Sequence, residues 1–64
     1  MESKIINNGK LLETIISSEV QKEYLHYFYN NKFYRLVKYA GEIIQVIKIK
    51  RENLSELAIY NLMK

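Results

Sequence analysis

The chain has 64 residues with a net charge of +3, one histidine, and neither cysteine nor proline. This composition excludes disulfides, and because aspartate is also absent it leaves too few ligands for a structural zinc or calcium site. A single domain spanning residues 1–64 would bury only about 60% of its unfolded surface. We therefore expect a homo-oligomer, a dimer or tetramer, to supplement a small core.

The residue usage indicates an origin and a compartment. Ile, Lys, Asn and Tyr supply 29 of the 64 residues, and their AT-rich codons indicate a low-GC bacterium, or one of its phages or plasmids. No apolar run approaches the about 20 residues that span a bilayer, and MESKIINNGK lacks the apolar region of a signal peptide. We expect a soluble, cytoplasmic protein without membrane contact.

The N-terminal third of the sequence is ambiguous. Residues 1–9 resemble a loose lead-in that ends at Asn7-Asn8-Gly9, a signal for a turn or for the start of a helix. Apolar residues between 10 and 23 recur at helical spacing, which favours a helix. The β-branched run Thr14-Ile15-Ile16 instead favours a strand over residues 10–16.

The middle of the sequence predicts an antiparallel meander. Residues 24–29, 32–39 and 42–50 are rich in aromatic and β-branched side chains. Asn30-Asn31 and Ala40-Gly41 separate these runs, and both pairs suit two-residue hairpin turns.

A C-terminal helix is predicted after the meander. Asn53 is a suitable N-cap, and Glu56 can complete a capping box with it. The apolar residues that follow have helical spacing, and the helix is expected to end near Met63; they are Leu54, Leu57, Ala58 and Leu62.

These elements predict an α+β fold, an antiparallel β-meander of three strands with a fourth N-terminal strand and a C-terminal α-helix. The order β-β-β-β-α resembles the PC4-like fold of single-stranded-DNA-binding coactivators. Small mobile-element inhibitors, some anti-CRISPR proteins among them, are similar in size and element order. The alternative order, α-β-β-β-α, resembles the double-stranded-RNA-binding domain and HicA-type toxins, but the lysine cluster of the former and the histidine turn of the latter are missing.

Two-residue turns would fix which side chains share a face of the sheet, because successive residues alternate. The first turn pairs Phe28 with Phe33, His26 with Arg35 and Tyr24 with Val37. The second pairs Val37 with Ile44, Arg35 with Val46 and Phe33 with Lys48. We call the side of the sheet that carries these paired residues the His26 face, and the opposite side, which carries Leu36, the Leu36 face. The Leu36 face is the more aliphatic, so we expect the C-terminal helix to cover it, while the N-terminal segment, another subunit or a ligand covers the His26 face.

The His26 face is also the candidate binding surface. Residues 32–51 carry six basic side chains against Glu42 alone, a local charge of +5. Bases stack on aromatic rings while Lys and Arg neutralise phosphates. Candidate nucleic-acid-binding residues are Tyr24, His26, Phe28, Phe33, Arg35, Tyr39, Lys48, Lys50 and Arg51. The same rings would equally serve as core or as a subunit interface.

The expected function is therefore that of a non-enzymatic, homo-oligomeric nucleic-acid-associated protein without cofactor or metal. His26 has no second histidine, cysteine or aspartate to complete a catalytic pair. The alternative is a phage or mobile-element inhibitor that binds a host protein, such as a host-defence nuclease, which would fit the small size and low-GC composition.

Overall fold

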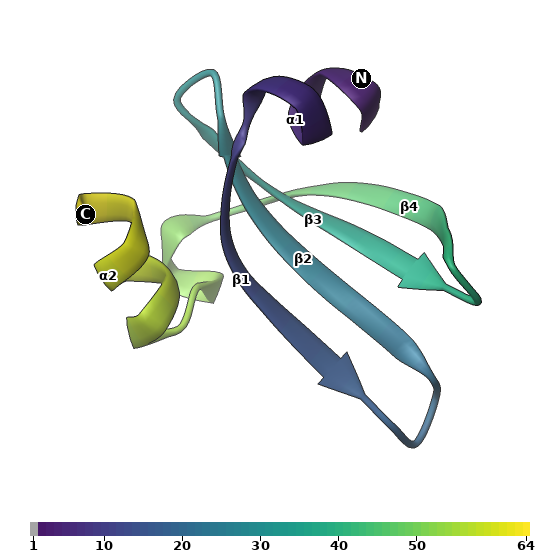
Figure 1. Cartoon of the computed structure of the whole chain (residues 1–64). Helices are drawn as coiled ribbons and strands as arrows, with labels where there is room; N and C mark the ends of the chain where they lie inside the picture. The colour runs from purple at the N-terminus through teal and green to yellow at the C-terminus, as the bar shows by residue number, and fades with distance from the viewer. Residues whose placement is uncertain (1) are drawn as a thin grey trace.

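The computed structural model describes residues 2–64 as one antiparallel sheet with a helix at each end of the chain (Figure 1). The sheet is a meander in the order β1-β2-β3-β4. The elements are α1 (Glu2–Asn8), β1 (Lys10–Ser17), β2 (Lys22–Tyr29), β3 (Lys32–Tyr39), β4 (Glu42–Ile49), a 3-10 turn (Arg51–Asn53) and α2 (Glu56–Met63). The α+β class, the fourth, N-terminal strand and the C-terminal helix are confirmed. The chain also has a helix at each end, as in the alternative order, but the N-terminal one is formed by residues 2–8 and not by residues 10–23.

The first nine residues were predicted wrongly as a lead-in. Residues 2–8 form helix α1, while residue 1 lies outside the described part of the chain. The Gly9 N–H donates to the Ile5 carbonyl over 2.8 Å and closes the helix. A Cβ on Gly9 would lie 2.5 Å from that carbonyl oxygen, so glycine is needed at this junction.

Strand β1 resolves the ambiguity of residues 10–23 in favour of a strand. It pairs with β2 through a β-bulge, in which Leu11 lies opposite Tyr27, Glu13 lies opposite His26 and Leu12 is the extra residue. The bulge brings two consecutive buried residues, Leu12 and Glu13, against the C-terminal segment.

The hairpin between β2 and β3 has the predicted register. His26 pairs with Arg35 and Phe28 with Phe33. Asn30 and Asn31 have φ of 54° and 63°, the left-handed conformation that a type I′ turn requires.

The predicted register between β3 and β4 is correct for the pairs next to the turn and wrong for the rest of β4. The turn at Ala40-Gly41 forms, but Ile44 is an extra residue, because Ile43 pairs with Lys38 and Gln45 pairs with Val37. Every later residue of β4 therefore moves to the opposite face. The expected partners Ile44, Val46 and Lys48 are replaced by Gln45, Ile47 and Ile49.

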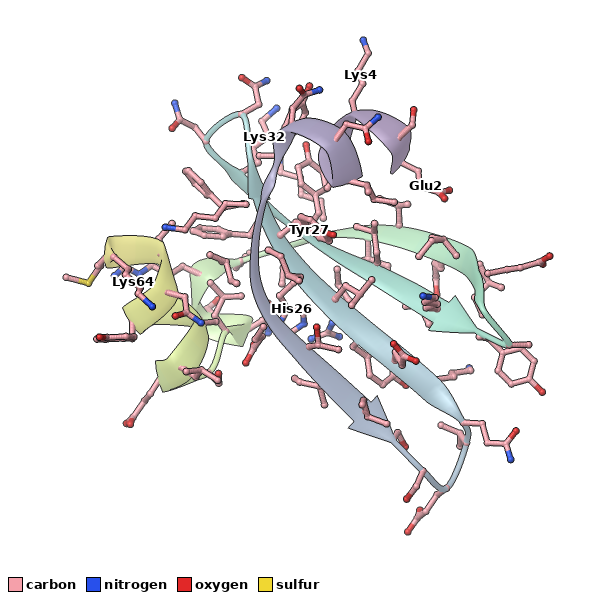
Figure 2. The ribbon with its side chains drawn as sticks, viewed as in Figure 1. Glu2, Lys4, His26, Tyr27, Lys32 and Lys64 are labelled. Carbon is pink, nitrogen blue, oxygen red and sulfur yellow. The ribbon has the colours of Figure 1, made fainter. Side chains whose placement is uncertain are left out.

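The two helices pack against different parts of the sheet. Helix α1 covers the Leu36 face, where Ile5 packs with Tyr27, Tyr34 and Leu36; Tyr27 is labelled beneath the helix in Figure 2. The expectation that the C-terminal helix covers this face is wrong, because α2 packs along β1 and Ser55 bonds to Glu13 on the His26 face. Neither helix in residues 2–64 is long and apolar enough to cross a lipid bilayer.

The N-cap of α2 is Ser55 and not the predicted Asn53. The Ser55 side chain accepts from the Ala58 N–H over 3.3 Å. Asn53 belongs to the preceding 3-10 turn, where its Oδ1 accepts from the Lys50 N–H over 3.2 Å. The helix ends at Met63, as expected.

Candidate anion- and base-binding pocket

An open pocket of about 190 Å³ lies on the His26 face, and its walls come from three neighbouring strands. Ile15 of β1 lies opposite Tyr24 of β2, and His26 of β2 lies opposite Arg35 of β3. These four residues line the pocket. Because the strands are paired, the register alone brings these side chains together.

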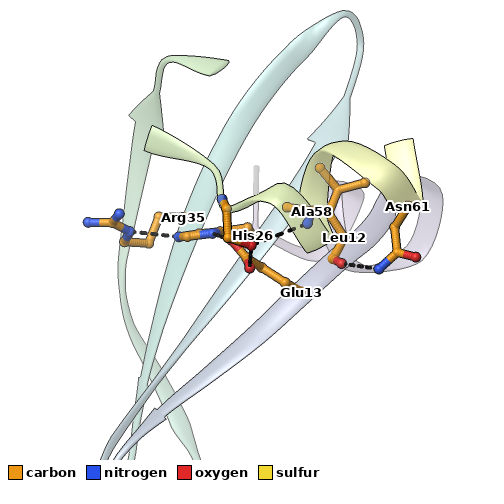
Figure 3. A network of polar contacts seen from close by, with 7 residues as sticks. Leu12, Glu13, His26, Arg35, Ala58 and Asn61 are labelled. Atoms are coloured by element: carbon orange, nitrogen blue, oxygen red, sulfur yellow. Dashed lines mark hydrogen bonds and ion pairs between the residues drawn. The ribbon is translucent and has the colours of Figure 1, made fainter. Parts of the chain in front are cut away.

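A chain of polar contacts links two of these residues, His26 and Arg35, to Glu13 (Figure 3). Arg35 Nε donates to His26 Nε2 over 3.0 Å, and His26 Nδ1 lies 2.6 Å from Glu13 Oε2. The other carboxylate oxygen of Glu13 accepts from the Ser55 hydroxyl. The network therefore links β1, β2, β3 and the start of α2.

The network gives each ring nitrogen of His26 its own hydrogen-bond partner. An arginine guanidinium has donors only, so His26 Nε2 must accept and carries no proton. Nδ1 is then the nitrogen that donates to Glu13. His26 thus bridges an arginine and a carboxylate.

Glu13 is held in its ionised form. Burial alone would raise its pKa, but the hydrogen bonds from Ser55 and His26 outweigh that effect and lower the pKa below the ordinary value of 4.5. The Glu13 side chain is only 5% exposed and that of His26 only 1%. A buried carboxylate that is paired in this way costs little, whereas an unpaired one would be strongly destabilising.

Arg35 and Tyr24 are the predicted site residues that line the pocket beside buried His26. The Arg35 guanidinium carbon lies 5.8 Å from the centroid of the Tyr24 ring, within the range of a cation–π contact. His26 is buried. It therefore supports Arg35 from beneath, and a large ligand on the face would contact Arg35 and Tyr24 first.

The other predicted aromatic residues lie elsewhere on the His26 face. Phe28 and Phe33 are half-buried and pack on each other with ring centroids 5.2 Å apart. Tyr39 lies at the far end of β3 and is 45% exposed. The structure thus places one exposed ring and one half-buried ring, Tyr39 and Tyr24, on the open part of the face.

The predicted basic residues do not all lie on the His26 face. Lys48 was placed on the wrong face, because the bulge at Ile44 pairs it with Tyr34 on the Leu36 face. Lys50 and Arg51 are exposed directly after β4.

The residues that sequence reasoning missed are mainly on β1 and at the start of β2. Glu13 and Ser55 could not be predicted, because the network depends on a β-bulge and on a contact between these two residues, which are 42 positions apart in the sequence. Lys22 pairs with Tyr39 and with Ser17, which places it on the His26 face. Lys22 stands two residues before Tyr24, so side-chain alternation would have placed both residues on the same face if the predicted strand had begun at residue 22 instead of residue 24.

Comparison with protein-family models, with curated proteins and with solved structures found no match. Within residues 2–64, no group of three or more His, Cys, Asp or Glu side chains could hold a metal ion. The residues that line the pocket offer a guanidinium donor, an aromatic ring and an apolar wall.

Proposed function

We propose that this protein is a non-enzymatic binding protein for single-stranded nucleic acid, and that the open part of the His26 face is its binding surface. The observation that carries the proposal is the pocket in which Arg35 is held beside the ring of Tyr24. Nucleic-acid strands are bound by proteins that combine basic groups for phosphates with rings on which bases stack. Both kinds of group are present here on one sheet face.

The arrangement of charge along the face supports a strand-like ligand. Lys22 is cross-strand neighbour to Tyr39, and Tyr24 lies two residues farther along β2. Arg35 follows on β3, opposite His26. Basic and aromatic side chains therefore alternate along the surface, with Glu42 as the acidic side chain at its end, opposite Tyr39.

Fluorescence anisotropy with a labelled single-stranded oligonucleotide, measured across a salt series, tests the proposal. The double variant Lys22→Ala, Arg35→Ala is expected to lose at least about tenfold in affinity, and each lost phosphate contact should lower the salt slope by about 0.7. The matched control is Lys38→Ala, Lys48→Ala, which removes the same charge from the Leu36 face. No binding at low salt, or equal losses in the two double variants, would refute the proposal.

The protein is further proposed to act as a homo-oligomer. Strands β1 and β4 are the edges of the sheet, and β4 exposes Ile44 and Val46. An exposed edge with apolar side chains is a template for pairing with another chain. Light scattering should give the mass of a dimer or tetramer, and Val46→Lys should lower it. A monomer at micromolar concentration would contradict this part of the proposal.

A second candidate function, an inhibitor that binds a host-defence nuclease, is favoured by the outer surface of α2. Leu57, Tyr60 and Met63 follow one another at intervals of three residues and are 60%, 64% and 76% exposed. Apolar surface of this kind is typical of a protein interface. Inhibition of a nuclease from a low-GC bacterium, abolished by Leu57→Ser with Tyr60→Ser but retained by Lys22→Ala with Arg35→Ala, would support it; no inhibition across a panel of such nucleases would refute it.

A further inference from the structure

The guanidinium of Arg35 is oriented before any ligand arrives. Its Nε is occupied by His26, and His26 is in turn held by Glu13 and Ser55. No hydrogen bond joins either terminal nitrogen, Nη1 or Nη2, to another group among residues 2–64. The outer end of the guanidinium therefore presents two parallel donors in a fixed direction, and a ligand does not have to order them.

The rest of the pocket suits a flat, apolar ring. Two of its walls are the ring of Tyr24 and the side chain of Ile15, which is 44% exposed. The volume of about 190 Å³ is smaller than the roughly 300 Å³ at which pockets for whole small-molecule ligands begin. The pocket has room for one base of a strand, and a fully hydrated phosphate ion would gain nothing from its apolar walls.

The charged group of the pocket offers a ligand hydrogen-bond donors and no acceptor. Both nitrogens of His26 are already bonded, so the charged group left for a ligand is the guanidinium of Arg35, which has donors only. A matching base must bring two acceptors side by side. Guanine does so with O6 and N7, and arginine is the side chain that most often reads this pair. Adenine places an amino donor beside N7, where it would face the donors of Arg35.

We infer that the pocket formed by Ile15, Tyr24, His26 and Arg35 is a guanine-selective subsite, an inference that rests on the proposed nucleic-acid binding. The base stacks on Tyr24 and accepts two hydrogen bonds from Arg35 through O6 and N7. His26 and Glu13 are positioning residues, because they act through Arg35 and do not touch the base. The remainder of the strand lies along Lys22 and Tyr39.

The test uses oligothymidylates that carry one central base, which is guanine, hypoxanthine, 7-deazaguanine, adenine or cytosine. Guanine should bind about 5- to 140-fold more tightly than adenine, the discrimination expected of one bidentate pair. Hypoxanthine keeps O6 and N7 and should retain the preference, whereas 7-deazaguanine lacks N7 and should lose it. Arg35→Lys keeps the positive charge but lacks the two parallel donors of the guanidinium, so this variant should bind all five strands with similar affinity.

The outcomes separate this inference from the proposed function. Equal binding of all strands by the unmodified protein, a preference for cytosine, or an undiminished preference for 7-deazaguanine would overturn the guanine subsite while leaving strand binding in place. Binding of no strand at low salt would overturn the proposed function itself. Because the base analogues leave the protein unchanged, the result does not depend on how a variant folds.

Discussion

Replacing Glu13 with glutamine should cost this protein a large part of its stability. The carboxylate accepts from Ser55 and His26, and a glutamine of the same shape can present an acceptor to only one of them. The retained bond becomes neutral, a loss of about 1 kcal/mol, and the other donor then faces an amide N–H, which costs about 1–3 kcal/mol. The expected loss is about 2–4 kcal/mol, out of a total that for 64 residues is roughly 3–10 kcal/mol.

The pH dependence of this loss of stability gives a second test of the same reasoning. The folded protein holds the pKa of Glu13 below the ordinary value of 4.5, so the stabilisation is fully present above that pH. It is lost as the pH falls through the lower pKa of the folded state, because the native protein must then take up a proton. The difference in stability between the original protein and Glu13→Gln should therefore be largest at pH 7 and shrink below pH 4.5.

Urea unfolding followed by circular dichroism, repeated between pH 7 and pH 3, measures both effects. Glu19→Gln is the matched control, since Glu19 is exposed in the turn between β1 and β2 and should change stability by no more than about 0.5 kcal/mol. Equal stability of Glu13→Gln and Glu19→Gln at pH 7 would refute the reasoning. So would a difference that stays constant down to pH 3.

Three further substitutions have definite signs, and the same urea unfolding at pH 7 measures each. Gly9→Ala should destabilise by about 1–3 kcal/mol, because the added Cβ meets the Ile5 carbonyl oxygen; no change would contradict that contact. Ala40→Gly should stabilise by about 1 kcal/mol, because Ala40 has a φ of 52°, and a loss of stability would show that the turn is not left-handed. Ser55→Ala should cost about 1–2 kcal/mol, since it removes the cap of α2 and a bond to Glu13, and Ser55→Thr should recover most of this loss.

The parts of the fold that the sequence predicts are those decided by neighbouring residues. Asn30-Asn31 is a turn signal that acts locally, and it determines the register of β2 and β3 without help from the rest of the chain. Ala40-Gly41 likewise forms its turn. Helix α1 has no apolar stripe beyond a few residues, and it is stable because Ile5 is buried against the sheet, which is information that lies elsewhere in the chain.

The two β-bulges are where prediction by alternation fails. At Ile44 one extra residue reverses the face of every later side chain on β4, so Lys48 leaves the candidate surface and Ile47 enters it. Nothing in EIIQVIKIK marks the position of that residue, because both faces of the strand carry isoleucine. A strand with apolar residues on both faces leaves its register to tertiary packing.

The bulge at Leu12 has the larger consequence, because it creates the candidate site. Cross-strand alternation alone identifies His26 and Arg35 as partners, and a histidine beside an arginine then suggests a pair of cationic groups that both face a ligand. The bulge instead brings Glu13 opposite His26, where its carboxylate accepts a hydrogen bond from Nδ1 and leaves Nε2 to accept from Arg35. The histidine is thereby removed from the surface, and the arginine gains a fixed direction. A surface that the sequence presents as generally basic thus becomes one oriented guanidinium beside one ring, which is the arrangement on which the proposed guanine subsite rests.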